Sequence, residues 1–280
     1  MGLIVGVLVG CDTPRKNWTS TLEQCGAASE IAPLKDCIYF GTSSGLGPGT
    51  VLVRNKSGYT ILFRLADVET NEQMLHLILD STNIENTCSD GETNYWSFDP
   101  TALVSSTADT NINANLSIAL NHAKNVTYNI KGWRLDTLNY YPFIAASTRW
   151  DPIYKSVLND KNAILITSAY KIEGFKATYQ IDSTNAVNLG GNLATSTNIA
   201  ISKVLGANAN ISWADQSHNT LQIETDGFYV FGQPSYFDHN NPMYSGAQFD
   251  YTHVALLPTS AKRNAKITVN MIAPAGQSGQ

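Results

Sequence analysis

The sequence has 280 residues, with hydrophobic side chains at 43% and aromatic side chains at 10% of its positions. These values are typical of a folded globular chain and exclude both a disordered chain and a polytopic membrane protein. Charged residues reach only 15%, against about 25% in an ordinary soluble domain, and the net charge is −5 at pH 7. This balance excludes nucleic acid as the main ligand, because no long basic run matches a phosphate backbone.

Small neutral hydrogen-bonding side chains take the place of charge, with 26 Asn, 26 Thr and 23 Ser residues. A surface made of these groups repels a second copy of itself only weakly. Such a composition is common in subunits that lie side by side in virions, surface layers and extracellular appendages. It therefore favours self-association, with copies of this chain or other assembly subunits as the partners.

An apolar run opens the first segment, residues 1–49, and is followed by Gly10 and Cys11. One interpretation is a packed strand that serves as an interface arm, because such a run left in water aggregates. The other is a resemblance to the lipobox of bacterial lipoproteins, which implies lipidation of Cys11 and anchoring in the bacterial envelope. The side chains of the run are Leu3, Ile4, Val5, Val7, Leu8 and Val9.

Four cysteines, Cys11, Cys25, Cys37 and Cys88, lie in the first third of the chain. Their spacing matches neither a zinc site nor a Cys-x-x-Cys redox motif, so we expect no metal and no cofactor. In an oxidising compartment, a disulfide between Cys25 and Cys37 would close a short loop. In a reducing compartment, the thiols are expected to be small buried hydrophobic groups.

The segment 41–45 matches the G-x-S-x-G pattern of a nucleophile elbow, in which Ser43 would be the nucleophile. An elbow needs a helix directly after the serine, whereas a turn rich in glycine and proline and a new strand follow here. The five histidines also lack the spacing of a metal site. We therefore expect a protein without enzyme activity. Glycoside hydrolysis would need two carboxylates that face each other. The sequence alone does not place the candidates against each other, and these are Asp67, Glu69, Asp182 and Glu224.

From residue 50 onward, apolar and polar residues alternate with the period of two that is typical of half-buried strands. This pattern predicts an all-β or β-dominated α+β fold, either an antiparallel sandwich or two packed sheets of ten or more strands, with one or two short helices. We expect a β-rich domain over 50–272, as one unit or as two packed sub-domains that divide near 182–220, and a flexible tail at 273–280. The predicted strands are 50–54, 59–65, 74–79, 111–120, 125–130, 163–169, 175–181, 198–204, 221–224, 227–231, 252–257 and 267–272.

The longest alternation predicts an antiparallel hairpin over 111–130, with one apolar face and one face lined by Asn. Asp226-Gly227 is expected to form a tight turn, and Gly174 to separate two strands. The segment 80–93 is polar enough to be an extended loop.

One helix is clearly marked at 151–159. Asp151 suits the N-cap, Pro152 suits the first helical position, and Ile153 and Val157 lie four apart on one face. We expect this helix to lie across a sheet.

The order of these elements resembles the pore-forming domain of gasdermins. The resemblance covers a long strand pair at 111–131, the segment 133–143, the helix at 151–159, and the strand pair 163–169 and 175–181. It implies that amphipathic hairpins enter a membrane and form a pore.

Aromatic residues cluster at 95–98 and 140–143, with Trp133 and Trp150 beside the second cluster. Exposed clusters would bind sugar rings, a membrane interface or a partner, and buried ones would be core. A carbohydrate-binding module that takes a glycan is therefore a further alternative.

Taken together, these features predict a non-enzymatic, self-associating structural subunit of a virion, surface layer or extracellular appendage. Three alternatives stay open: a lipid-anchored lipoprotein of a multiprotein complex in the bacterial envelope, a gasdermin-like pore former, and a carbohydrate-binding module. Membrane contact through the N-terminus belongs to the first of these alternatives.

Overall fold

The computed structural model describes most of the central part of the chain, and every structural statement below refers to those residues. The predicted arm at Leu3 to Val9, Cys11, Cys25 and the tail lie outside them. The described ranges are 14–24, 34–43, 46–56, 58–84, 90–93, 116, 118–120, 123, 125–189, 208–237, 256–258 and 266–269.

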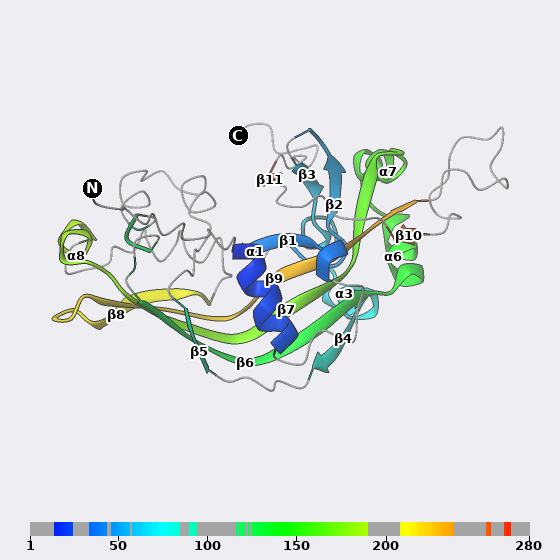
Figure 1. Ribbon diagram of the computed structural model, residues 1–280. Helices are drawn as coiled ribbons and strands as arrows, with labels where there is room; N and C mark the ends of the chain where they lie inside the picture. The colour runs from blue at the N-terminus through cyan, green and yellow to red at the C-terminus, as the bar shows by residue number, and fades with distance from the viewer. Residues whose placement is uncertain are drawn as a thin grey trace, which may run out of the picture.

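The fold is dominated by one hydrogen-bonded sheet (Figure 1). Its main path runs β1-β9-β7-β2-β3-β11, and the other strands join it through pairs with β6 and β9. All of the pairs are antiparallel except β3 with β11. The strands are β1 (Ile38–Ser43), β2 (Val51–Arg54), β3 (Gly58–Phe63), β4 (Leu79–Ile84), β5 (Asp90–Thr93), β6 (Asn125–Leu138), β7 (Ala163–Gln180), β8 (Asn210–Asp215), β9 (Thr220–Phe237), β10 (Leu256–Pro258) and β11 (Lys266–Val269).

The prediction of a strand-dominated, largely antiparallel fold with short helices is confirmed. The sandwich or pair of packed sheets is not confirmed, because every described strand belongs to the same sheet. The helices are α1 (Pro14–Gln24), the 3-10 helix η2 (Leu34–Asp36), α2 (Leu65–Val68), α3 (Glu72–Ile78), α6 (Tyr140–Ser147), α7 (Pro152–Leu158) and α8 (Ser183–Leu189).

Three long strands, β6, β7 and β9, form the centre of the sheet and curve along their length (Figure 1). β7 and β9 each replace a pair of shorter predicted strands, and β6 extends the single predicted strand 125–130 to Leu138. Gly174 lies inside β7 and Asp226-Gly227 lies inside β9, so the predicted turn at Asp226-Gly227 and the predicted break at Gly174 are wrong. The glycines instead mark a place where the alternation of faces shifts by one residue in all three strands.

We call this place the bend line. Buried side chains on each strand are normally two residues apart, but here they are three apart: Ile130 to Trp133 in β6, Ile172 to Phe175 in β7, and Thr225 to Phe228 in β9. The pairs stay in register on both sides, because Ile130 faces Phe175 and Trp133 faces Ile172. An extra residue in each strand therefore keeps the same face apolar across the bend, as a β-bulge does for one strand.

Glycine is required on the bend line by backbone geometry. Gly174 has φ +58 and Gly227 has φ +153, conformations that residues with a Cβ rarely adopt. A Cβ on Gly227 would lie 2.1 Å from the carbonyl oxygen of Ile172, and a Cβ on Gly174 would lie 2.4 Å from Cδ of Lys131. β9 can lie this close to the backbone of β7 only because Gly227 has no side chain.

Short helices pack against one end of the sheet, where α6 and α7 connect β6 to β7. We call this end the base of the sheet. The predicted helix at 151–159 is confirmed as α7, and the Asp151 carboxylate accepts a hydrogen bond of 2.9 Å from the backbone N–H of Ile153. Phe143, Trp150 and Leu158 are buried there in one cluster with residues of β2, β3 and α3.

Two predicted strands are helical instead. The segment 74–79 falls mostly in α3, where Asn71 caps the helix by accepting from the N–H of Met74 at 3.1 Å. Leu116 and residues 118–120 are also helical. Leu116 and Leu120 are buried four residues apart, so the alternating pattern contained a helical spacing as well.

Strand pairing corrects two further expectations. The hairpin over 111–130 does not form in the described residues, because β6 pairs with β5 and β7. The segment 80–93 is not an extended loop throughout, because β4 and β5 both lie in it and pair with β6.

A substitution on the bend line tests whether its geometry is required. We expect Gly227→Ala to lower the free energy of unfolding by ~2–4 kcal/mol, because the strained backbone and the clash with Ile172 add together. Gly132→Ala in β6 is the matched control, since its Cβ would have only Glu173 near it, at 3.8 Å. Urea denaturation measures both, and equal effects would contradict this account.

Candidate functional site

On the side of the bend line away from α6 and α7, four paired strands form a sheet with one polar and one apolar face, which we call the distal sheet. It consists of 125–130 of β6, 175–180 of β7, 220–225 of β9, and β8. Because adjacent side chains of a strand point to opposite faces, each row of paired residues belongs to one face. The rows alternate between apolar and polar side chains, except that Thr225 lies in the apolar row of Ile130 and Phe175.

The polar face carries neutral and oppositely charged groups that are half-buried or exposed. Lys176 and Glu224 are directly opposite each other, with Nζ and Oε1 3.0 Å apart, so their charges cancel locally. One row reads Asn129, Lys176, Glu224 and Asn210, and the next reads Thr127, Thr178, Gln222 and Ser212.

The apolar face lies under a cover made of α1, Leu116 and the helical residues 118–120. Its rows read Val126, Tyr179, Leu221 and Trp213, then Tyr128, Ala177, Ile223 and Ile211. Trp18 of α1 packs edge-on against Trp133 and Phe228, with ring centroids 6.3 and 6.0 Å apart. Leu116, Ala119 and Leu120 belong to the same buried cluster. The cover therefore shields a continuous apolar surface from water.

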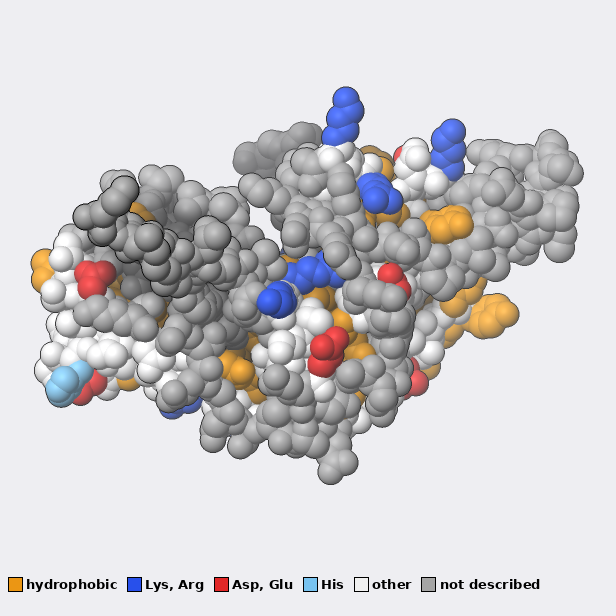
Figure 2. All heavy atoms as spheres, viewed as in Figure 1, with side chains coloured by type: hydrophobic (Ala, Val, Ile, Leu, Met, Phe, Trp, Pro, Cys, Tyr) orange, Lys and Arg blue, Asp and Glu red, His pale blue; other side chains and the backbone are white. Residues whose placement is uncertain are grey.

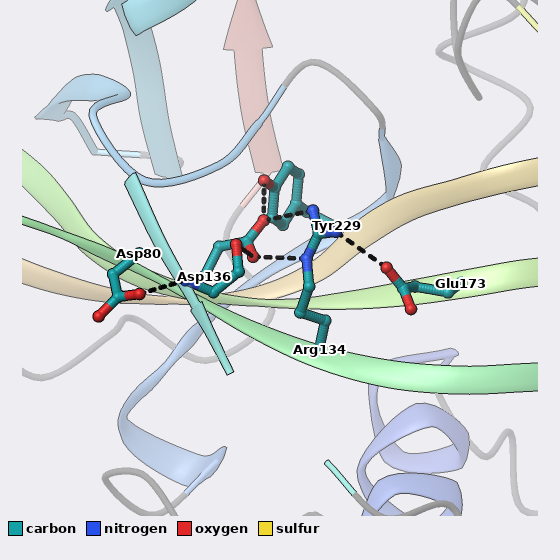
Figure 3. Close-up of polar contacts among 6 residues, drawn as sticks. Asp80, Arg134, Asp136, Glu173 and Tyr229 are labelled. Carbon is teal, nitrogen blue, oxygen red and sulfur yellow. Dashed lines mark hydrogen bonds and ion pairs between the residues drawn. The ribbon is translucent and has the colours of Figure 1, made fainter. Parts of the chain in front are cut away.

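On the opposite face, a polar cluster ties β4, β6, β7 and β9 together at the base of the bend line (Figure 3). Asp136 is almost fully buried and accepts hydrogen bonds from Arg134 at 2.6 and 3.0 Å, from the Ser81 hydroxyl at 2.7 Å and from the Tyr229 hydroxyl at 2.5 Å. The other side of the Arg134 guanidinium donates to Glu173 at 2.9 Å.

The electrostatics of this cluster favour a charged Asp136. Burial alone would raise the pKa of its carboxyl group, but the hydrogen bonds from Arg134, Tyr229 and Ser81 outweigh burial and hold the pKa below its ordinary value of 3.8. Lys171 lies 5.7 Å from the centre of the Tyr229 ring and adds a second cation beside the cluster. With two cations and two carboxylates, the cluster is neutral as a whole.

The sequence-predicted chemical residues are dispersed. Ser43 is the last residue of β1, and β2 follows after a turn. The four candidate carboxylates each have a different partner: Asp67 pairs with Arg64, Glu69 accepts from Trp150, Asp182 accepts from Asn185, and Glu224 pairs with Lys176. The structure does not assemble them into one acid–base pair.

Of the two cysteines predicted to form a disulfide, only Cys37 is described. Its side chain is buried, Sγ donates a hydrogen bond of 3.8 Å to Oε1 of Gln233, and burial raises the pKa of the thiol to about 12. The Cys25–Cys37 disulfide, the arm and lipidation of Cys11 stay predictions, because Cys25, Cys11 and the arm lie outside the described residues.

The aromatic cluster around 140–143 is largely core. Trp133, Phe143 and Trp150 are buried, whereas Tyr141 is 85% exposed. In the described ranges, no group of three or more His, Cys, Asp or Glu side chains is placed to hold a metal ion. No helix among the described residues combines the length and hydropathy needed to cross a membrane. The described Lys and Arg side chains visible in Figure 2 form separate small groups.

Comparisons with known proteins give a distant similarity to a solved structure. No family model matches the sequence, and a comparison with curated proteins finds no match. Among solved structures, the chain is similar to a bacterial gasdermin from Bradyrhizobium tropiciagri, with a TM-score of 0.41 and 10% identity over 93% of this chain and 98% of that chain. A similarity this distant assigns no function to the chain.

Sequence reasoning missed the polar cluster. Its one local signal is the spacing of Arg134 and Asp136, two residues apart and therefore on the same face of a strand. The partners Ser81 and Tyr229 are 55 and 93 residues from Asp136 along the chain, so only the folded sheet brings them together.

Removing the charge at the centre of the cluster tests its role. We expect Asp136→Asn to lower the free energy of unfolding by ~2–4 kcal/mol, because Arg134 loses its buried counterion while staying mostly desolvated. Glu173→Gln removes the other, more exposed partner of Arg134 and should cost less than ~1 kcal/mol. Urea denaturation at neutral pH compares the two, and a larger loss for Glu173→Gln would contradict the assignment.

The lowered pKa of Asp136 also predicts a pH dependence. A carboxyl whose pKa is lower in the folded than in the unfolded state contributes stability above its unfolded pKa and loses it as the pH falls through the folded value. The stability difference between wild type and Asp136→Asn should be constant between about pH 5 and 7 and shrink below the ordinary value of 3.8. Unfolding curves at several pH values measure this; a difference that grows on acidification would contradict it.

Proposed function

We propose that this protein is a membrane pore former in which the distal sheet meets lipid with its apolar face and water with its polar face. The observation that carries the proposal is the alternation of apolar and polar rows across β6, β7, β9 and β8. Strands that cross a membrane around an aqueous channel need this division, with every backbone group paired to a neighbouring strand.

The length of the alternating region supports the proposal. Along β7, the apolar face extends from Tyr170 to Tyr179, which is about ten residues. A tilted strand needs about 9–11 residues to cross the hydrocarbon part of a bilayer. The paired segments of β6 and β9 run alongside this stretch, from Leu135 to Val126 and from Phe231 to Leu221, with one register shift in the pairing of β9 between Tyr170 and Lys171.

The composition of the polar face also supports an aqueous channel. Its side chains are amides, hydroxyls and one ion pair, and none of them needs a protein partner when water is present. The same face in a packed sandwich would have to bury these groups against a second sheet, at a cost for each group left without a hydrogen bond.

In this proposal, the cover takes the place of lipid before insertion. Trp18 and Leu22 of α1, with Leu116, Ala119 and Leu120, bury the apolar face in the water-soluble form. Insertion then requires the cover to leave, and the free energy of the cover–sheet contact sets the fraction of molecules that are ready to insert.

The other functions stay predictions. A structural subunit and a lipoprotein both depend on the N-terminal segment outside the described residues, and a carbohydrate-binding module depends on exposed aromatic rings. A location in a virion, at an extracellular surface or in the bacterial envelope stays a prediction as well. Self-association is shared with the proposed pore, because several chains are needed to enclose a channel.

Dye release from liposomes tests the proposal. The full chain is added to vesicles of phosphatidylcholine and phosphatidylglycerol in equal parts, and we expect Trp18→Ala to release dye about tenfold faster than wild type or more. Truncating a buried Trp costs ~3–5 kcal/mol, and each ~1.4 kcal/mol lost from the covered form raises the uncovered fraction tenfold. Urea denaturation gives the stability of each variant.

Trp150→Ala is the matched control. This tryptophan is also buried, but it packs on Phe63 and Phe143 at the base of the sheet, away from the distal sheet. It should lower stability by a similar amount without the same gain in leakage. If wild type and Trp18→Ala both leave the vesicles intact, or if Trp150→Ala accelerates leakage as much, the proposed function is wrong.

A further inference from the structure

Two polar atoms are buried without a hydrogen-bond partner in the described part of the chain: Nε1 of Trp133 and the hydroxyl oxygen of Tyr179. Trp133 is 1% exposed and Tyr179 is fully buried. Both belong to the apolar cluster between the sheet and the cover. Each group lost its hydrogen bonds to water on folding and gained none in return, so each destabilises the covered form.

These two side chains lie near opposite ends of the apolar face. Tyr179 is paired with Val126, so its row crosses β6 at residue 126. Trp133 lies on the same strand about seven residues further, which corresponds to roughly 23 Å at about 3.3 Å per residue. Between them lie the apolar rows of Tyr128 and Ile130 and the bend line.

The row at each end contains a second amphipathic aromatic side chain or lies next to one. Trp213 shares the row of Tyr179 through Leu221, and Tyr170 lies two residues from Ile172, the partner of Trp133. The rows between hold Ala177, Ile223 and Phe175, together with Tyr128, which lies in the row next to that of Tyr179. An apolar band bounded at both levels by Trp and Tyr is the arrangement of strands whose ends lie in the two interfaces of a bilayer.

We infer that Trp133 and Tyr179 are lipid-interface anchors, one for each leaflet, and that their Nε1–H and O–H groups donate to lipid headgroup or ester oxygens after insertion. The inference rests on the proposed pore function and names its lipid contacts. In the inserted state, the two donors form hydrogen bonds, because the membrane–water interface supplies the acceptors that the covered form lacks. Release of these two groups from the cover also favours insertion.

Removal of the donors tests the inference with effects of opposite sign. Tyr179→Phe deletes only the unpartnered hydroxyl, so the melting temperature should stay the same or rise. Leakage from the phosphatidylcholine–phosphatidylglycerol vesicles should nevertheless slow roughly fivefold, the equivalent of one hydrogen bond of about 1 kcal/mol. Trp133→Phe should slow leakage by a similar factor, and the double variant should be slower than either single one.

Tyr154→Phe is the control, because it removes a buried tyrosine hydroxyl from the cluster at the base of the sheet. It should leave the leakage rate within a factor of two of wild type. If Tyr179→Phe and Trp133→Phe release dye at the wild-type rate, the anchor inference is wrong, and the proposed pore function is not contradicted. If wild type and Trp18→Ala both fail to release dye, the pore and the anchors are wrong together.

Discussion

The extra residue shared by β6, β7 and β9 at the bend line is the constraint on which the rest of the structure depends. A one-residue shift in a single strand would turn its side chains to the wrong face from that point on. Because the shift occurs at paired positions, Ile130 opposite Phe175 and Trp133 opposite Ile172, all three strands keep one apolar face. Gly174 and Gly227 make this possible, since the strands touch where their side chains would be.

The two faces of the long strands are stabilised by different physical interactions. On one face, Trp18 contacts Trp133, Phe175 and Phe228, an apolar contact without directional partners that a lipid chain would satisfy equally well. On the other face, Asp136 is fixed by hydrogen bonds from three strands. The hydrogen bonds that join Asp136 to β4 and β9 therefore lie on the face of the sheet away from the cover.

Local patterns in the sequence located several of the strands but not their lengths, and they missed β4, β5 and β8. Period-two alternation located β2, β3 and parts of β6, β7 and β9, because face alternation is a property of neighbouring residues. Gly174 and Asp226-Gly227 indicated turns, since a left-handed glycine fits both a chain reversal and an extra residue in a strand, and only pairing with the next strand decides. The polar cluster was hidden for the same reason: Tyr229 is 93 residues from Asp136.

The position of β9 in the sheet has a consequence for synthesis. This strand pairs with β1, β7, β8 and β10, and it lies near the C-terminal end of the described residues. On the ribosome, β1, β6 and β7 emerge long before it, so the central hydrogen bonds of the sheet form only when most of the chain has been made. Until then, the edge of β7 that pairs with β9 has no partner strand. An unpaired edge of this length is prone to pair with other chains, so this is the stage at which a chaperone would be most needed.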